Sequence, residues 1–157
     1  YRETTLDDGH LIHALIKRCP PLDLNSCYHY LLLASHFHET CIVAEHQAIG
    51  GFISAYVHPL QAETLFVWQV AVDPQWRRLG LGLNMLDGLL ARPRLAAVQY
   101  LETTISPSNS ASRNLFESLA RKLKAPHLVS DYFTPVHFGG AQHEAEQLHR
   151  IGPFCRS

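Results

Sequence analysis

The sequence lacks the features that mark several large classes of protein. No apolar run in its 157 residues approaches the roughly 18 residues of a membrane-spanning helix, and no signal peptide is visible. Acidic and basic side chains nearly cancel, with a net charge of −1 at pH 7, so no basic surface for nucleic acid or anionic membrane is expected. We therefore expect a cytoplasmic protein without nucleic-acid or membrane partners. The chain begins at Tyr1 without a methionine, which leaves open whether native residues precede it.

Cysteine pairs and metal-binding motifs are also missing. The four cysteines have no paired spacing, so we expect free thiols in a reducing compartment, each packed as a small buried side chain: Cys19, Cys27, Cys41 and Cys155. Eleven histidines invite a metal hypothesis, but His143-Glu144 lacks a second histidine at the metalloprotease spacing. His36 and His38, two residues apart near a helix end, would point in different directions. No metal site is expected.

The composition is that of one soluble globular domain. Apolar residues make up 46% of the chain and charged residues 17%, and the length is sufficient for a sizeable core. The sequence contains no repeat, low-complexity tract or linker. We expect a single domain over residues 1–157.

Residues 64–90 are the stretch around which the chain is organised. The apolar and β-branched run 65–72 predicts a buried strand, which Asp73-Pro74 ends because proline has no N–H for a ladder. Two glycines follow, and apolar residues at 83, 86, 89 and 90 keep the spacing of a helix. A glycine turn between a strand and a helix N-terminus presents unpaired N–H groups, which is typical of a pyrophosphate site.

The motif Arg77-x-x-Gly80-x-Gly82 resembles the acyl-CoA signature of the GCN5-related N-acetyltransferase superfamily. A Rossmann loop would need a third glycine where Met85 stands, and the Gly-Lys-Ser/Thr of a P-loop is absent from the sequence. A purely structural glycine turn stays open as the alternative.

The remaining elements follow from periodicity, caps and breakers. Thr5-x-x-Asp8 is typical of a helix cap, and Leu11, Ile12, Leu15 and Ile16 would form the apolar face of that helix. Asn25 or Ser26 can cap a second, short helix. We expect strands at 2–5, 41–44, 51–57, 65–72, 100–105, 127–133 and within 147–154, and a helix around 115–119 that ends near 124–126.

This order of elements resembles the N-acetyltransferase fold over essentially the whole chain. The resemblance implies an α/β domain with a mixed, mostly antiparallel sheet, splayed central strands and flanking helices. It also implies that the pantetheine arm of acetyl-CoA lies between those strands, and that cofactor binding falls to Gln69, Val70, Val72, Arg77, Arg78, Gly80, Gly82 and Asn109. Asn109, which precedes a helix, can instead simply cap it.

Four blocks carry a closer resemblance, at 22–30, 66–74, 101–109 and 150–153. They resemble the L-2,4-diaminobutyrate acetyltransferases of ectoine biosynthesis. The implied reaction is acetyl transfer from acetyl-CoA to the 4-amino group of L-2,4-diaminobutyrate, which serves osmoprotection. Homodimers are common among such relatives.

A diamine with one carboxylate needs a pocket with negative charge, aromatic faces and hydrogen-bond donors. The residues that can supply these are Asp23, Asn25, Ser26, Tyr28, Tyr30, Trp68 and Thr104. Trp68 could also be simple core in a buried strand, and Tyr28 and Tyr30 could pack at the helix surface. Both alternatives stay open.

The candidates for removing a proton from the attacking amine are Glu144, His143 and Glu102, although Glu144 could be an ordinary solvated acid. Many relatives carry a tyrosine, which protonates the departing thiolate, where this chain has Phe116. Tyr132 or a water would then serve, unless the thiolate leaves unprotonated.

Two other functions compete. Another small-amine or peptide acetyltransferase is one, although the long segment 134–146 favours a covered small-molecule pocket. A non-catalytic acyl-CoA sensor is the other, and it would keep the glycine motif without an acidic, aromatic pocket.

Overall fold

The computed structural model describes residues 1–140 and 142–155. Within them the chain forms two compact units, which are treated separately below. Unit 1 comprises Tyr1–Val57 and Val67–Ala97, and unit 2 comprises His58–Phe66 with the described residues that follow Ala97. Six strands are hydrogen-bonded in the order β1-β2-β3-β4-β6-β5 in this described part of the chain. The expected mixed sheet with flanking helices is confirmed. The single domain over 1–157 stays a prediction.

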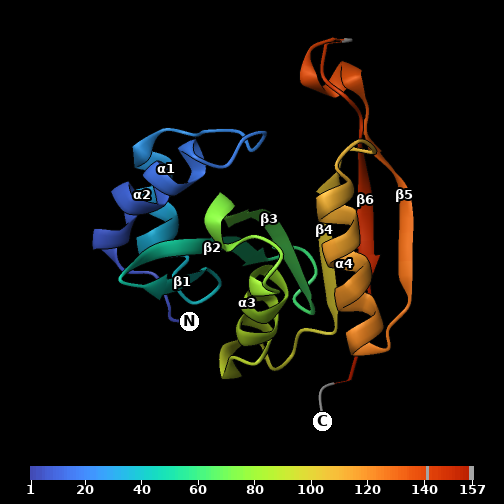
Figure 1. Ribbon diagram of the computed structural model, residues 1–157. Coiled ribbons are helices and arrows are strands. Elements are labelled where there is room, and N and C mark those ends of the chain that lie inside the picture. The colour runs from blue at the N-terminus through green and yellow to red at the C-terminus, as the bar shows by residue number, and fades with distance from the viewer. Residues whose placement is uncertain (141, 156–157) are drawn as a thin grey trace. The chain divides into compact units, whose positions relative to one another are not determined.

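Unit 1 holds helices on both sides of its strands (Figure 1). Helices α1 and α2 lie on one side of β1 and β2, and α3 lies on the other. The elements are α1 (Gly9–Lys17), α2 (Cys27–His36), β1 (Ile42–His46), β2 (Ala48–Val57), the larger part of β3 (Thr64–Val72), α3 (Leu81–Leu90) and three 3₁₀ turns, η1 (Leu6–Asp8), η2 (Pro74–Trp76) and η3 (Pro93–Leu95).

The start of the chain differs from the expectation. Residues 2–5 form no strand, because Arg2 makes an isolated bridge to Val43 and the chain then turns into η1. The Asp8 carboxylate accepts the Thr5 N–H at 2.7 Å, so the predicted cap is present. Leu11 is 43% exposed although Ile12 and Leu15 are buried. A helix of nine residues buries one stripe, and Leu11 lies about 100° away from Ile12 around its axis.

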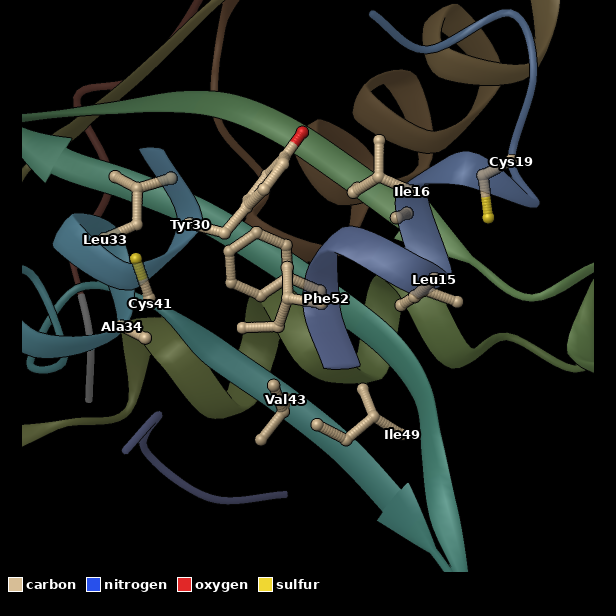
Figure 2. Close-up of a cluster of buried hydrophobic side chains, with 12 residues drawn as sticks. Leu15, Ile16, Cys19, Tyr30, Leu33, Ala34, Cys41, Val43, Ile49 and Phe52 are labelled. Atoms are coloured by element: carbon tan, nitrogen blue, oxygen red, sulfur yellow. The ribbon is translucent and has the colours of Figure 1, made fainter. Parts of the chain in front are cut away.

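The core of unit 1 lies between α1, α2 and the first strands (Figure 2). Tyr30 and Phe52 are fully buried at its centre, and the Tyr30 ring packs near Phe52 with its hydroxyl directed away from the aliphatic side chains. Burial of this kind contributes about 25 cal/mol per Å² of apolar surface removed from water. Cys19 and Cys41 pack in this cluster as small apolar side chains, as expected.

The other two cysteines do not match that expectation. Cys27 is half-buried and Cys155 is exposed, because they lie on the first turn of α2 and beyond the last strand. All four are free thiols. Burial raises the pKa of the Cys41 thiol to about 11.

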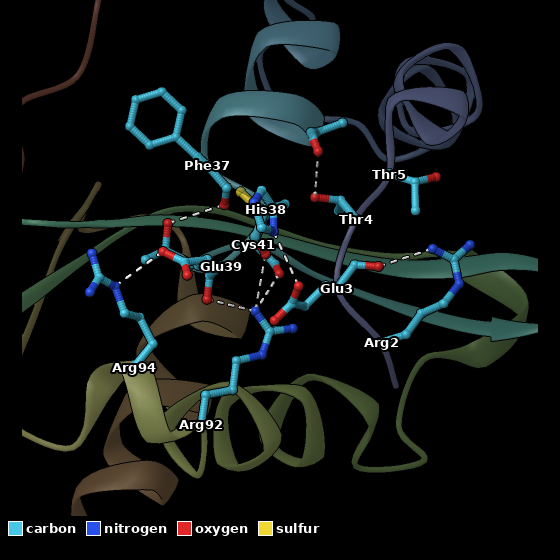
Figure 3. A network of polar contacts seen from close by, with 12 residues as sticks. Arg2, Glu3, Thr4, Thr5, Phe37, His38, Glu39, Cys41, Arg92 and Arg94 are labelled. Carbon is cyan, nitrogen blue, oxygen red and sulfur yellow. Dashed lines mark hydrogen bonds and ion pairs between the residues drawn. The ribbon is translucent and has the colours of Figure 1, made fainter.

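Arginines tie loops of unit 1 together through backbone carbonyls (Figure 3). Arg92, just after α3, donates from Nη1 to the carbonyls of Glu39 and Cys41, both at 2.8 Å. Arg2 makes a two-pronged ion pair with Asp8, at 2.7 and 2.9 Å. The Arg2 guanidinium holds the pKa of Asp8 below its ordinary value of 3.8.

Unit 2 is a sheet with one long helix packed along it. Its elements are the start of β3, β4 (Tyr100–Ile105), α4 (Ser110–Leu123), β5 (His127–Phe133), η4 (Pro135–Phe138) and β6 (Glu146–Ile151). β3 pairs in parallel with β4 over Thr64–Phe66, and β6 pairs antiparallel with both β4 and β5. Helix α4 runs lengthwise along the strands of this sheet (Figure 1). It buries Phe116, Leu119 and Ala120. The last strand ends at Ile151, earlier than the predicted 154, where Gly152 takes a φ of +134°.

Candidate active site

The glycine turn in unit 1 forms an open helix N-terminus. Gly80 occupies the N-cap of α3 with φ +74°, a left-handed conformation that suits glycine. Glycine has no side chain with which to cap the helix, and the first intrahelical bond runs from Asn84 N to Gly80 O at 3.0 Å. The N–H groups of Leu81, Gly82 and Leu83 therefore have no intrahelical acceptor. They lie at the positive end of the helix dipole, an arrangement that binds phosphate.

The residues before the turn hold it at the end of β3. Arg77 Nε donates to the Val72 carbonyl at 3.2 Å, and Arg78 takes a positive φ of 65°. Asp73 accepts the Gln75 N–H at 3.1 Å and pairs with Arg18 at 3.0 Å. The Gln75 N–H and then Arg18 lower the pKa of Asp73. Arg77 and Arg78 are exposed, as cations for a phosphate would be.

The backbone of β3 offers fewer free N–H groups than the sequence analysis expected. Gln69 N donates to Ser54 Oγ at 3.1 Å, so this N–H already has an acceptor. Val70 and Val72 are half-buried and stay candidates for binding the thioester oxygen. The Gln69 side chain instead binds the backbone of the segment before α2: Nε2 donates to the Asp23 carbonyl at 2.8 Å.

That segment supplies several predicted substrate residues. The exposed Asp23 carboxylate makes no hydrogen bond or ion pair with the residues that the structure describes. Ser26, not Asn25, caps α2 by accepting the His29 N–H at 3.3 Å. The two tyrosines differ: Tyr28 is 69% exposed, whereas Tyr30 is fully buried. Tyr28 therefore lies at the surface and Tyr30 does not, and a role of Tyr28 toward the substrate stays a prediction.

Trp68 lies at the surface of β3, with 49% of the side chain exposed. The core alternative is therefore wrong, because the neighbours Val67 and Gln69 point to the buried side and an alternating strand turns Trp68 outward. His29, which the sequence analysis missed, stands edge-on to Trp68 at 4.8 Å and to Tyr30 at 5.0 Å. Burial lowers the pKa of His29.

In unit 2 the predicted base Glu102 is already engaged. Glu102 is 7% exposed and forms an ion pair with Arg150, which faces it directly in the β4–β6 register. The Arg150 guanidinium also lies 3.9 Å over the Tyr100 ring. Thr104, a predicted substrate residue, donates its hydroxyl to Glu146 at 2.5 Å.

Glu144 and His143 lie together on the segment before β6. Glu144 accepts the Ser108 N–H at 3.0 Å and the Ser108 hydroxyl at 2.5 Å, which ties this segment to the turn before α4. His143 Nδ1 lies 2.6 Å from the Glu144 carbonyl, which can only accept, so the proton is on Nδ1. The lone pair is then on Nε2. The His143 ring stacks on Phe138 at 3.7 Å.

Two further predicted positions have structural partners. Asn109 caps α4 by accepting the Ser112 N–H at 3.1 Å, and its role toward pantetheine stays a prediction. Phe116 is 2% exposed in the core of unit 2, and Tyr132 is 47% exposed on β5.

The predicted site residues are divided between the two units. Unit 1 holds the glycine turn, the segment around Asp23 and Trp68, and unit 2 holds Glu102, Thr104, Asn109, His143 and Glu144. Ser108, Glu146, Arg150, Ser54 and His29 were missed, because their contacts join distant parts of the sequence. Within residues 1–140 and 142–155, no cluster of three or more metal-ligating side chains is found. In that same part of the chain no helix is long and apolar enough to cross a membrane.

Comparison with known proteins shows the family of this chain. Residues 10–120 match the model of the acetyltransferase (GNAT) family. The chain is 48% identical to the L-2,4-diaminobutyric acid acetyltransferase of Virgibacillus pantothenticus over 98% of this chain and 97% of that protein. It is also 48% identical to the protein of that name from Chromohalobacter salexigens, over 98% of this chain and 80% of the relative.

A solved structure is similar over the same length. Diaminobutyrate acetyltransferase EctA from Paenibacillus lautus, in complex with its substrate L-2,4-diaminobutyric acid and coenzyme A, superimposes with a TM-score of 0.94 at 44% identity. The match covers 99% of this chain and 95% of that one. The chain therefore belongs to the GNAT acetyltransferase family and, within it, to the L-2,4-diaminobutyric acid acetyltransferases.

Proposed function

We propose that this protein transfers the acetyl group of acetyl-CoA to the 4-amino group of L-2,4-diaminobutyrate, the reaction of ectoine biosynthesis that the sequence resemblance implies. The observation that carries the proposal is the likeness, over the whole chain, to the Paenibacillus lautus enzyme with that substrate and coenzyme A. The open N-terminus of α3, with Arg77 and Arg78 exposed beside it, fits the pyrophosphate of the co-substrate. We propose no metal for this reaction.

In the proposed mechanism the amine attacks the thioester carbonyl directly. Acetyl-CoA supplies the activated acetyl group, and a backbone N–H of β3, at Val70 or Val72, stabilises the developing oxyanion. The attacking ammonium must first lose a proton, since an alkyl amine has a pKa near ~10.4. The C–N bond of the product amide forms, the C–S bond breaks and the thiolate of coenzyme A leaves.

Among the three candidate bases, the contacts favour His143 and Glu144 over Glu102. If Glu102 took a proton it would lose its ion pair with Arg150 inside a buried site, which is costly. His143 has its proton fixed on Nδ1 by the Glu144 carbonyl, which leaves Nε2 to accept one. We propose that His143 and Glu144 act together, with the exposed Glu144 carboxylate as the alternative acceptor.

The substrate residues complement the two ammonium groups and the carboxylate. The Asp23 carboxylate and the exposed face of Trp68 supply negative charge and a cation–π surface. Tyr28 is exposed on the same unit, and Ser26 carries a hydroxyl. For Thr104, which belongs to unit 2, the role toward the substrate stays a prediction. Asn25 contributes a backbone N–H to Tyr30 and keeps its amide for the substrate carboxylate.

The same proposal includes the cellular setting and the assembly. A cytoplasmic homodimer fits the resemblance. Support for self-association comes from the apolar side chains that β5, the last strand of the sheet in unit 2, exposes: Leu128, Val129, Tyr132 and Phe133.

Thiol release from acetyl-CoA with a panel of amines tests the proposal. We expect L-2,4-diaminobutyrate to react best, ahead of L-ornithine, L-lysine and 4-aminobutyrate, and NMR of the product to show the acetyl group on the 4-nitrogen. Free-amine chemistry alone favours the α-nitrogen, which is the weaker base of the two, so 4-acetylation reports selection by the protein. Acetylation at the 2-position would contradict the proposal. If none of the tested amines led to thiol release, the result would favour the acyl-CoA sensor.

A further inference from the structure

A buried chain of hydrogen bonds in unit 1 joins α2, β3 and the segment that carries Asp23. The Tyr30 hydroxyl donates to Gln69 Oε1 at 3.2 Å. Gln69 Nε2 in turn donates to the backbone carbonyl of Asp23 at 2.8 Å. The chain therefore runs from the core to the residue whose carboxylate is exposed.

The same hydroxyl holds a second point of the segment. Tyr30 OH accepts the backbone N–H of Asn25 at 3.3 Å, so the segment is bound on both sides of Leu24. Gln69 is fixed from its other side, because its N–H donates to the buried Ser54 hydroxyl at 3.1 Å. Two backbone atoms of an exposed segment are thus attached to side chains that the core holds still.

Neither Tyr30 nor Gln69 is placed to contact a substrate itself. Tyr30 is 0% exposed and Gln69 6% exposed. The Tyr30 hydroxyl uses its proton on Gln69 and a lone pair on Asn25, and Gln69 uses both ends of its side-chain amide. A buried donor or acceptor that lost such a partner would be left unsatisfied, at a cost in free energy. This cost accounts for hydrogen bonds at both ends of the Gln69 amide and on both sides of the Tyr30 hydroxyl.

We propose that Tyr30 and Gln69 are positioning residues that fix the direction of the Asp23 carboxylate and so select which nitrogen of the substrate is acetylated. The inference rests on the proposed function. The carboxylate holds the α-ammonium, and the 4-amino group is the one left to reach the thioester. A loosened Asp23 weakens diaminobutyrate binding and admits the α-nitrogen, which is the more easily deprotonated of the two.

Tyr30→Phe tests the hydroxyl while keeping the ring that packs against Phe52 and His29. We expect the KM for diaminobutyrate to rise about 2- to 10-fold, the range for loss of one hydrogen bond. The Kd for acetyl-CoA, measured by calorimetry, should stay within about twofold, since hydrogen bonds to the α3 N-terminus are untouched. NMR should detect 2-acetyl product that the parent does not form, as it should for Asp23→Asn.

Gln69→Leu removes both links to Gln69 and serves if the tyrosine variant folds poorly. We expect it to raise the KM at least as much as Tyr30→Phe. The double variant should raise the KM further than Gln69→Leu alone, because it also removes the bond from the Asn25 N–H to the Tyr30 hydroxyl.

Thr4→Val is the matched control. Thr4 is 4% exposed and its hydroxyl donates to the Ala34 carbonyl of α2 at 3.1 Å, so this variant also loses a buried bond to the same helix. It should lower the Tm while the KM and the acetylated position stay those of the parent. If Tyr30→Phe and Gln69→Leu behave as Thr4→Val does, the positioning role is refuted. A parent that fails to acetylate diaminobutyrate would instead refute the proposed function.

Discussion

Trp68 lies within the apolar run 65–72, yet about half of its side chain is exposed to solvent. The His29 ring packs against it in an edge-on arrangement. An exposed indole on a strand adds little to the free energy of folding. It does offer a π face to a cation, and an indole binds cations better than a benzene ring. At the residue scale, the exposed indole of Trp68 is the clearest indication that β3 contributes to function as well as to the hydrophobic core.

We predict that Trp68→Phe raises the KM for diaminobutyrate about 2- to 5-fold and that Trp68→Leu raises it further, to about 10-fold, because cation–π contacts contribute roughly 0.5–2 kcal/mol. Steady-state kinetics measures both. The Tm and the Kd for acetyl-CoA should change little, since the side chain is half exposed. An unchanged KM with a lowered Tm would show that Trp68 is structural.

At the scale of elements, a substitution in the first turn of α3 can change the affinity for acetyl-CoA without lowering the stability of the fold. Gly82 is the second residue of this helix, where a carboxylate is favourable to the helix dipole and unfavourable to a bound pyrophosphate. A negative charge there should therefore spare the fold and oppose the co-substrate.

We predict that Gly82→Asp weakens acetyl-CoA binding by more than about tenfold, measured by calorimetry, while the Tm stays at or above that of the parent. Gly82→Ala is the control for size, since alanine is a better helix former and adds no charge. It should bind acetyl-CoA nearly as the parent does. Equal affinity of the aspartate variant and the parent would remove the glycine turn from the phosphate site.

At the scale of the whole molecule, we expect acidic pH to lower the free energy of unfolding through a histidine pair in unit 2. His127 Nε2 and His149 Nδ1 lie 3.0 Å apart, and His149 is 3% exposed. Burial lowers the pKa of both below the ordinary value of 6.5, with Arg113 of α4 adding to the effect at His149 and Glu117 opposing it at both. Protonation of both rings would place two donors and two charges against each other.

We predict that the free energy of unfolding falls as the pH drops below about 6.5. In this range the two histidines bind protons in the unfolded chain but stay neutral in the folded protein, because their folded pKa values are lower. The stability lost in this window is fully present above pH 6.5. Denaturant titrations at a series of pH values measure the slope, which His127→Gln should reduce. NMR titration of the rings provides a direct check, and a folded pKa at or above 6.5 for both histidines would contradict the prediction.

The sequence by itself determined the local structure of this protein. The caps at Thr5 and Ser26, the break at Asp73-Pro74 and the glycines at the start of α3 act on backbone within a few residues. Periodicity and turn chemistry were therefore enough to predict most helices and strands. The glycine motif was enough to indicate the family, because the pyrophosphate site is made by consecutive residues.

Only the tertiary structure decided which side chains are occupied and which are available. The Glu102–Arg150 ion pair depends on the register of two strands 48 residues apart, and the Gln69 bond to Asp23 spans 46. The exposure of Trp68 depends on which face of β3 is buried in the fold. Such contacts follow from packing between distant segments, on which spacing along the chain carries no information, and so the sequence could name Glu102, Tyr30 and Gln69 without their partners.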